Sequence, residues 1–258
     1  MTHLFQFLAG IGSGLAGGAL SGMFGIGGGI VLVPLLGVAL HLDQHRAQGV
    51  TLAAMLLPIG LPAVLHYREE GIPIDWPLVG LIVAGFLGGV LAGSSVANLI
   101  PPRPLRFGFV AFLVFVAIRT LWHHAQSPSA QRVPAGTRSL LLPGLVTGLA
   151  GGAASGLLGI GGGVLIIPLL MTWLGYSQRQ ATATSLAVML PPIGLPGVLV
   201  YAKAQGGLPW VLLVGVALGF AAGAGLGARI ATRLHGAWLT RAFAALLVAM
   251  AVLLAFKA

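Results

Sequence analysis

The sequence predicts an all-α integral membrane protein whose two halves repeat one another. Apolar residues make up 57% of the chain and charged residues only 7%, whereas a soluble domain carries about 25% charged residues. Residues 21–36 return as residues 155–170, at an offset of 134 residues that continues without a gap to Trp76 and Trp210. Two copies of a unit that carries a Gly-rich break inside an apolar run are typical of membrane transporters with internal pseudo-symmetry.

Each predicted unit contains five apolar segments. Those of the first unit cover about residues 5–24, 29–40, 47–66, 77–99 and 105–122, and those of the second about 140–158, 163–174, 180–202, 208–232 and 238–256. A helix needs about 20 residues to cross the hydrocarbon core of a bilayer. The second segment of each unit is shorter than this, so we expect it to be a half-helix or a re-entrant element. Counted either way, the chain has 8–10 helical segments.

These segments predict a first unit at residues 1–122, a linker loop at 123–139 and a second unit at 140–258. The linker is polar and contains proline, as exposed tethers do, and its adjacent His123 and His124 are better explained by a solvated loop than by a metal site. If all five segments of a unit cross the membrane, the two units are inverted relative to each other. If the short segment only dips in and returns, the units are parallel. We prefer the inverted arrangement, in which the larger group of arginines is cytoplasmic and both termini lie outside.

The net charge of +9 would suggest nucleic acid as the partner of a soluble protein. Here the basic residues lie near the ends of apolar segments, where they meet lipid headgroups. We therefore expect the lipid bilayer, and not nucleic acid, to be the partner. The chain has no cysteine, which excludes disulfides and thiolate metal sites, and we expect no cofactor.

The acidic residues indicate the charge of the substrate. All four of them, Asp43, Glu69, Glu70 and Asp75, fall in short loops of the first unit. Cation carriers and proton pumps usually hold a carboxylate within the membrane. Its absence argues against both classes and leaves an anion as the expected substrate.

Two glycine triplets are the strongest candidates for the binding site. Gly27-Gly28-Gly29 and Gly161-Gly162-Gly163 each precede a short apolar segment. Consecutive glycines disfavour helix, and unwound backbone at membrane depth is tolerated only inside protein or beside a water-filled cavity. A half-helix that begins there directs unpaired N–H groups and a positive dipole end at an anion, and no Cβ blocks its approach. The two breaks could therefore face each other and hold an oxyanion between them.

The alternative for the glycines is close helix packing, which we prefer for others such as Gly14 and Gly85. A nucleotide-binding loop is not supported, because no Lys-Ser/Thr pair accompanies the glycines.

Hydroxyl side chains lie next to the breaks and in a second repeated element. They could donate hydrogen bonds to an anion or bond to their own helix backbone, and the sequence leaves both open. The candidate substrate-binding residues are Ser21, Gly25, Gly27, Gly28, Gly29, Thr51, Ser155, Gly159, Gly161, Gly162, Gly163, Thr182, Thr184 and Ser185. Tyr67 and Tyr201 lie near segment ends, where we expect interfacial anchors. The histidines fall in or beside loops, so no catalytic constellation forms and we expect no enzyme activity.

The duplicated Ser-Gly-x-x-Gly-Ile-Gly-Gly-Gly-x-x-x-x-Pro-Leu-Leu of residues 21–36 and 155–170, with Ala-Thr-Ala-Thr-Ser-Leu-Ala at 181–187, resembles the sulfite exporter TauE/SafE family of the toluene-sulfonate uptake permease superfamily. The resemblance covers nearly the whole chain. The first unit departs from it at residues 47–53, which read Ala-Gln-Gly-Val-Thr-Leu-Ala. Hydroxyl contacts are therefore better supported in the second unit.

The resemblance implies a multi-pass secondary transporter in the bacterial inner membrane for small sulfur-containing anions, such as sulfite, sulfoacetate or other organosulfonates. A homo-oligomer is compatible with the sequence. A passive anion channel would use the same glycine-lined path and is the main alternative. A structural membrane subunit would give no reason for two matched breaks.

Overall fold

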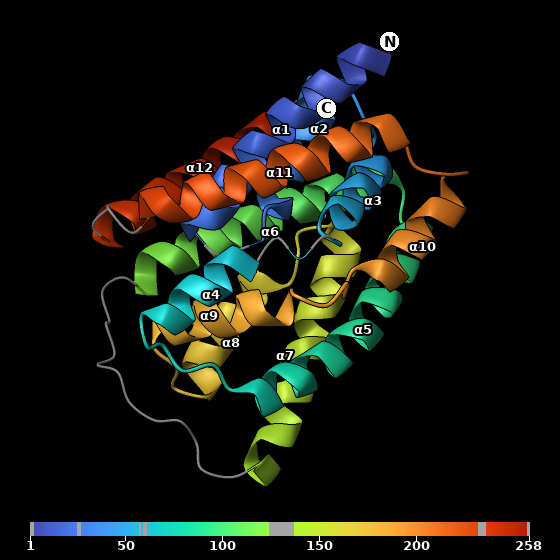
Figure 1. Cartoon of the computed structure of the whole chain (residues 1–258). Coiled ribbons are helices and arrows are strands. Elements are labelled where there is room, and N and C mark those ends of the chain that lie inside the picture. The colour runs from blue at the N-terminus through green and yellow to red at the C-terminus, as the bar shows by residue number, and fades with distance from the viewer. Residues whose placement is uncertain are drawn as a thin grey trace.

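The computed structural model describes residues 3–24, 27–56, 58, 61–123, 137–231 and 236–256. These residues form twelve α-helices and no strands (Figure 1). Among the described residues, four helices are long and apolar enough to cross a membrane, at His3–Met23, Trp76–Leu99, Leu140–Leu158 and Trp210–Gly227. The predicted all-α membrane fold is confirmed.

The helices follow the same order in both units. The first unit contains α1 (His3–Phe24), α2 (Gly29–Leu40), α3 (Gln44–Ala54), α4 (Leu61–Glu69), α5 (Trp76–Leu99) and α6 (Pro102–His123). The second contains α7 (Thr137–Leu158), α8 (Gly163–Trp173), α9 (Gln178–Val188), α10 (Leu195–Ala204), α11 (Trp210–Ala231) and α12 (Gly236–Phe256).

The third segment of each unit differs from the prediction, because it forms two helices where the sequence suggested one. α3 ends before Pro58, and α9 ends before Pro191 and Pro192. Proline removes a backbone donor and clashes with the preceding turn, so each segment breaks in its middle. Every unit therefore contains two breaks, one between its first two helices and one inside its third segment.

The long helices pair between the units and not within them. α1 packs along α11, and α5 packs along α7. Gly14 on α1 lies against the backbone of Val216, and Gly219 on α11 lies against the backbone of Ile11. Small residues let two backbones approach closely in membranes, and Gly14 lies in such a contact, as predicted.

The direction of the helices agrees with inverted units. Gly10 and Gly18 of α1 meet Leu212 and Phe220 of α11 respectively, so these two helices are parallel. In Figure 1, α1 runs from the upper right to the lower left, whereas α7, its counterpart in the repeat, runs upward from the bottom. The two marked chain ends lie at the same end of the molecule (Figure 1).

α2 returns along α1 without crossing the bilayer. Gly17 of α1 lies against the side chain of Leu32 on α2, and α2 has only 12 residues, or about 18 Å of helix. α3 then leads back toward the centre of the molecule, next to α2, α10 and α11. α2 is therefore a re-entrant half-helix, with Ile30, Leu32 and Leu36 fully buried in the core. This differs from the expectation that a returning short segment makes the units parallel, because α2 leads back to the end of the molecule at which α1 begins (Figure 1), and α1 and α2 together add no crossing.

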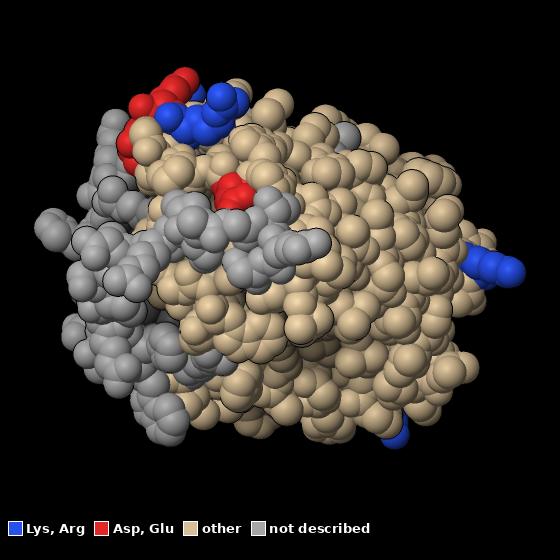
Figure 2. Space-filling view, turned by 90° about the horizontal axis from the view of Figure 1, so that it is seen from below, with Lys and Arg blue, Asp and Glu red and all other residues tan. Residues whose placement is uncertain are grey.

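The outer surface suits a lipid environment. Among the described residues, Figure 2 shows few charged side chains on this face, and most of them lie near its edges. Large apolar side chains such as Leu142, Trp210 and Phe256 are exposed, at 72%, 71% and 86% respectively. Apolar surface of this extent matches the hydrocarbon part of a bilayer.

The backbone contact between α1 and α11 predicts that Gly14→Leu destabilises the protein, whereas Gly12→Leu on the same helix does not. A Cβ at Gly14 would overlap the carbonyl oxygen of Val216, whereas nothing lies within 4 Å of one at Gly12. Overpacking of this kind costs about 1–3 kcal/mol or more. The thermal midpoint of the purified protein in detergent measures the difference. Equal midpoints for the two variants would contradict the close contact.

Candidate functional site

The two glycine breaks meet at the centre of the molecule. Gly27, Gly159 and Gly161 adopt the left-handed region, with φ of 67°, 70° and 70°, which glycine enters without steric cost. A Cβ built on Gly161 would lie 3.7 Å from Cα of Gly27. Residues from the two units are thus in contact, as the sequence suggested. Gly25 lies outside the described residues.

Not all of the triplet glycines line this contact. Gly28 lies against the ring of Phe220 on α11, and Gly162 lies against the ring of Phe86 on α5. A Cβ on Gly29 would overlap the backbone at Ile160. For these three positions, close packing accounts for glycine, while Gly27, Gly159 and Gly161 also need it for their backbone conformation.

Two methionines flank the glycine contact. Met55 follows α3 and Met189 follows α9 as their C-caps, and both are half-buried. The methyl carbon of Met55 would lie 3.0 Å from a Cβ on Gly27, and that of Met189 would lie 3.1 Å from the same Cβ. Met55 also lies against Gly161. The sequence analysis did not include them, although they repeat at the same offset as the glycines.

The beginnings of α2 and α8 leave backbone donors near this centre. Their N-caps are Gly28 and Gly162, and neither end has a side-chain cap. The first N–H groups of an α-helix have no partner within the helix, and the helix dipole makes this end positive. Two positive helix ends therefore lie beside the contact of Gly27 with Gly161.

Four of the predicted hydroxyl residues are fully buried and have no hydrogen-bond partner: Thr51, Ser155, Thr184 and Ser185. The bonds to their own helix that the sequence left open are therefore absent. The Gly159 N–H donates to the carbonyl of Ser155 at 2.7 Å, and the Met55 N–H to that of Thr51 at 3.1 Å. Ser155 thus lies one helical turn before the second glycine break, and Thr51 lies one turn before the end of α3 at Met55. Ser21 and Thr182 are also buried.

A buried hydroxyl without a partner is costly. Leaving such a group unpaired costs about 1–3 kcal/mol, and most buried polar groups of folded proteins have a partner. The four residues lie on α3, α7 and α9, the helices that end beside the glycine contact.

Gln48 and Tyr201 form a buried network that the sequence analysis missed. The Gln48 Nε2 donates to the carbonyl of Leu157 at 3.0 Å. The Tyr201 hydroxyl lies 2.8 Å from Gln48 Oε1 and 2.7 Å from the carbonyl of Gly156, and its one proton serves these two acceptors. Gln48 also packs against Gly159. The network joins α3, α7 and α10 directly behind the second glycine break.

Tyr201 corrects a prediction. We expected it to anchor the protein at the membrane interface, but its side chain is fully buried. The sequence did contain a hint of this role. Gln48 stands at the position that Thr182 occupies in the second unit, and a buried carboxamide needs a hydrogen-bond partner. No sequence pattern pairs the two residues, which lie 153 positions apart.

No group of three or more His, Asp or Glu residues in the described part of the chain is placed to hold a metal ion.

Comparison with known proteins gives one family and several relatives. Residues 10–254 match the family described as Sulfite exporter TauE/SafE. The chain is 32% identical over 213 residues to the Probable membrane transporter protein YdhB of Bacillus subtilis, covering 82% of this chain and 85% of the relative. It is 30% identical over 250 residues to a Probable membrane transporter protein of Xylella fastidiosa strain Temecula1, covering 94% and 92%. No solved structure matches the chain.

The network behind the second break predicts that Tyr201→Phe lowers stability by about 1–3 kcal/mol, because Gln48 Oε1 and the carbonyl of Gly156 lose their donor. Unfolding in detergent measures this change. Gln48→Met and the double variant complete a mutant cycle. The effects of the two changes should not be additive, since both remove the same hydrogen bond. Additive effects would show that the bond does not contribute.

Proposed function

Since the chain belongs to the sulfite exporter TauE/SafE family, we propose that it is a secondary transporter of a small sulfur-containing oxyanion. The family and the relatives make it a multi-pass membrane transporter. The proposal adds the substrate class, namely sulfite, sulfoacetate or another organosulfonate, and the bacterial inner membrane as its location. It also adds the site, which is the contact between the two glycine breaks.

The observation that carries the proposal is the set of four buried, unpaired hydroxyls around the breaks. An ionised sulfite or sulfonate group presents three oxygens that accept hydrogen bonds, and it has no hydrogen-bond donor of its own. Hydrogen bonds from neutral donors to an anion are stronger than those between neutral groups. An oxyanion bound there would satisfy Thr51, Ser155 and Ser185 and the free N–H groups at the beginnings of α2 and α8 at the same time.

The charge of the site supports an anion over a cation. The positive ends of α2 and α8 are at the centre, and the acidic side chains lie away from it. Asp43 and Asp75 are N-caps of α3 and α5, and Glu69 and Glu70 are exposed at the end of α4. No carboxylate offsets the helix dipoles, so the centre attracts negative charge.

The neighbouring apolar residues have separate roles in this proposal. The rings of Phe86 and Phe220 pack on Gly162 and Gly28, which excludes lipid from the unwound backbone. Met55 and Met189 contact the glycines through flexible side chains, so an anion that reaches the glycines displaces them. Methionine adapts to such changes because its thioether chain has low rotational barriers.

The glycine contact predicts that Gly161→Leu abolishes transport while the protein still inserts into the membrane. Position 161 needs a left-handed backbone, and a leucine side chain would occupy the space beside Gly27. Uptake of labelled sulfite into proteoliposomes measures the effect, and size-exclusion chromatography checks the fold. Gly80→Leu is the control, because nothing lies within 4 Å of a Cβ there.

Normal flux in Gly161→Leu and Gly27→Leu would contradict the proposed site. Flux in the wild type that saturates with sulfite concentration indicates a carrier, whereas flux that rises linearly indicates a channel.

The unpaired hydroxyls predict that Thr51→Val and Ser185→Ala each lower the transport efficiency for sulfite by about 10- to 100-fold, because a hydrogen bond to a charged group contributes about 1.5–3 kcal/mol. Initial rates of labelled uptake over a range of sulfite concentrations measure the efficiency. Ser95→Ala is the control, since that hydroxyl is exposed and bonded to the carbonyl of Leu91 on its own helix. Unchanged efficiency in both site variants would remove the hydroxyls from the proposal.

A further inference from the structure

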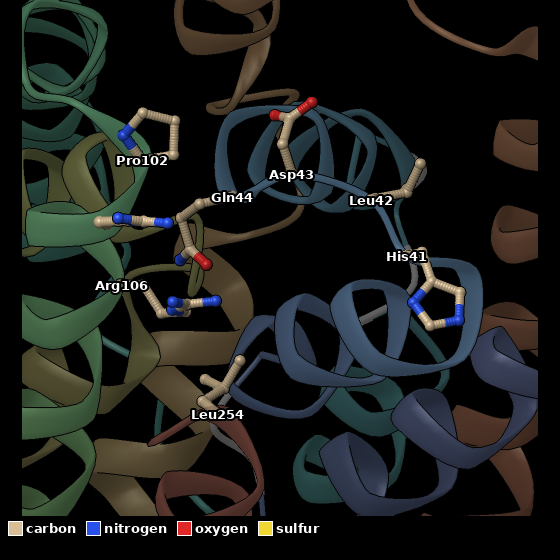
Figure 3. Close-up of a pocket in the computed structure, with 8 residues that line it drawn as sticks. His41, Leu42, Asp43, Gln44, Pro102, Arg106 and Leu254 are labelled. Carbon is tan, nitrogen blue, oxygen red and sulfur yellow. The ribbon is translucent and has the colours of Figure 1, made fainter. Parts of the chain in front are cut away.

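A cavity of about 250 Å³ lies at the outer end of α3, where the α2–α3 connection meets the beginning of α6 and the end of α12 (Figure 3). It is lined by His41, Leu42, Asp43, Gln44, Pro102, Arg103, Arg106 and Leu254. It is separate from the glycine breaks, because none of its residues belongs to them. Its lining combines two arginines, a histidine and a carboxamide in a protein that is otherwise poor in polar groups.

At the rim of this cavity, the backbone of His41 adopts a left-handed conformation that is unfavourable for a non-glycine residue. Its φ is 54°, and it is the one non-glycine residue with positive φ among the described residues. The second unit carries Gly175 at the matching position, with φ of 64°. The turn is therefore made by glycine in one unit and by a strained histidine in the other. His41 is the C-cap of α2, and Figure 3 shows its imidazole turned away from Gln44 and Arg106. The histidine therefore forms the turn at the rim of the cavity and does not lie beside the arginines.

Gln44 contributes an unpaired donor. Its side chain is 7% exposed, and its Nε2 has no hydrogen-bond partner. Figure 3 shows its carboxamide turned toward Arg106, on the cavity side of α3. A buried amide nitrogen without an acceptor calls for one, and an anion in the cavity would supply it.

The charges around the cavity favour an anion. Arg103 and Arg106 lie in the first two turns of α6, where the helix dipole is also positive. Asp43 is the one acidic residue of the lining. Its carboxylate accepts the Arg46 N–H at 2.9 Å and lies 3.6 Å from the Arg46 Nε. Figure 3 shows it pointing away from Arg106, so it does not neutralise the cavity.

α3 connects this cavity to the glycine breaks through a polar face. Gln44, Gln48, Thr51 and Met55 follow one another at intervals of four, three and four residues, which places them on one side of the helix. Gln48 and Thr51 are fully buried, although apolar side chains would be expected inside a membrane protein. The outer end of this face lies at the cavity, and its inner end lies at Gly161.

The matching region of the second unit, at the beginning of α9, has different polar groups among its described residues. At the outer end of α9, the Tyr176 hydroxyl donates to Asp75 Oδ2 at 3.3 Å, so an acidic group lies there. The positions that match Arg103 and Arg106 carry Ala237 and Thr240. Among the described residues, the matching end therefore differs from the cavity in its charge.

We propose that this cavity is a second oxyanion site, which collects the substrate before it moves along the polar face of α3 to the glycine breaks. The nature of the anion rests on the proposed function. Gln44 and Arg103 bind its oxygens, and Arg106 adds positive charge at the same end of α6.

Binding of labelled sulfite to the purified protein tests the proposal. We expect two anions per wild-type chain. Gln44→Met and Arg103→Gln should each weaken one of them at least tenfold, and Gly161→Leu should remove the other. Gln44→Met keeps the fold, because methionine is a good helix former of similar length and the amide nitrogen that it removes has no partner within the protein. Arg68→Gln, which makes the same change in charge on the exposed end of α4, should bind as the wild type does.

The other results separate this inference from the proposed function. Unchanged binding in both Gln44→Met and Arg103→Gln would overturn the second site, while a loss in Gly161→Leu would still support the central one. A single bound anion that is lost in Arg103→Gln and kept in Gly161→Leu would support the cavity and contradict the central site. No binding of sulfite to the wild type would overturn both.

Discussion

The constraint on which the structure depends is that backbone groups inside a bilayer must be paired within the protein or face a polar site. Gly27 and residues 159–161 interrupt helices in the middle of an apolar molecule. Such interruptions persist only where the surrounding protein encloses them. Phe86 and Phe220 cover the two glycine N-caps, and the long helices α5 and α11 that carry these rings are held in place by backbone contact with α7 and α1.

The packing of long helices across the two units determines which residues meet at the centre of the molecule. Because α1 packs on α11 and α5 on α7, neither unit forms a closed body alone. The second unit covers the first glycine break, and the first unit covers the second break. The unpaired donors are consequently contributed by both halves, with Thr51 from α3, Ser155 from α7 and Ser185 from α9. A site made in this way changes shape when the two halves move relative to each other, as alternating access requires.

Features that repeat in the sequence were predictable, and features that arise from contacts between distant segments were not. The duplicated glycine triplets predicted both breaks and the short helices after them, because consecutive glycines and a run of about a dozen apolar residues have direct structural meaning. The same reasoning did not divide the third segment into α3 and α4. Tyr201 and Met55 required the structure, since their contacts with Gln48 and Gly161 are made by the fold. Hydrophobic patterning does not encode such pairs.

The unequal chemistry of the two matched halves has an energetic consequence. In a transporter of two identical inverted units, a two-fold rotation exchanges the two units and converts the inward-open form into the outward-open form. The two forms then have equal free energy. Gln48 stands where the second half has Thr182, and its carboxamide is tied to Tyr201 and Leu157. A threonine hydroxyl is too short to form the same pair of bonds. In the transporter that we propose, such a network in one half alone makes the two forms unequal in free energy, so the empty protein favours one of them.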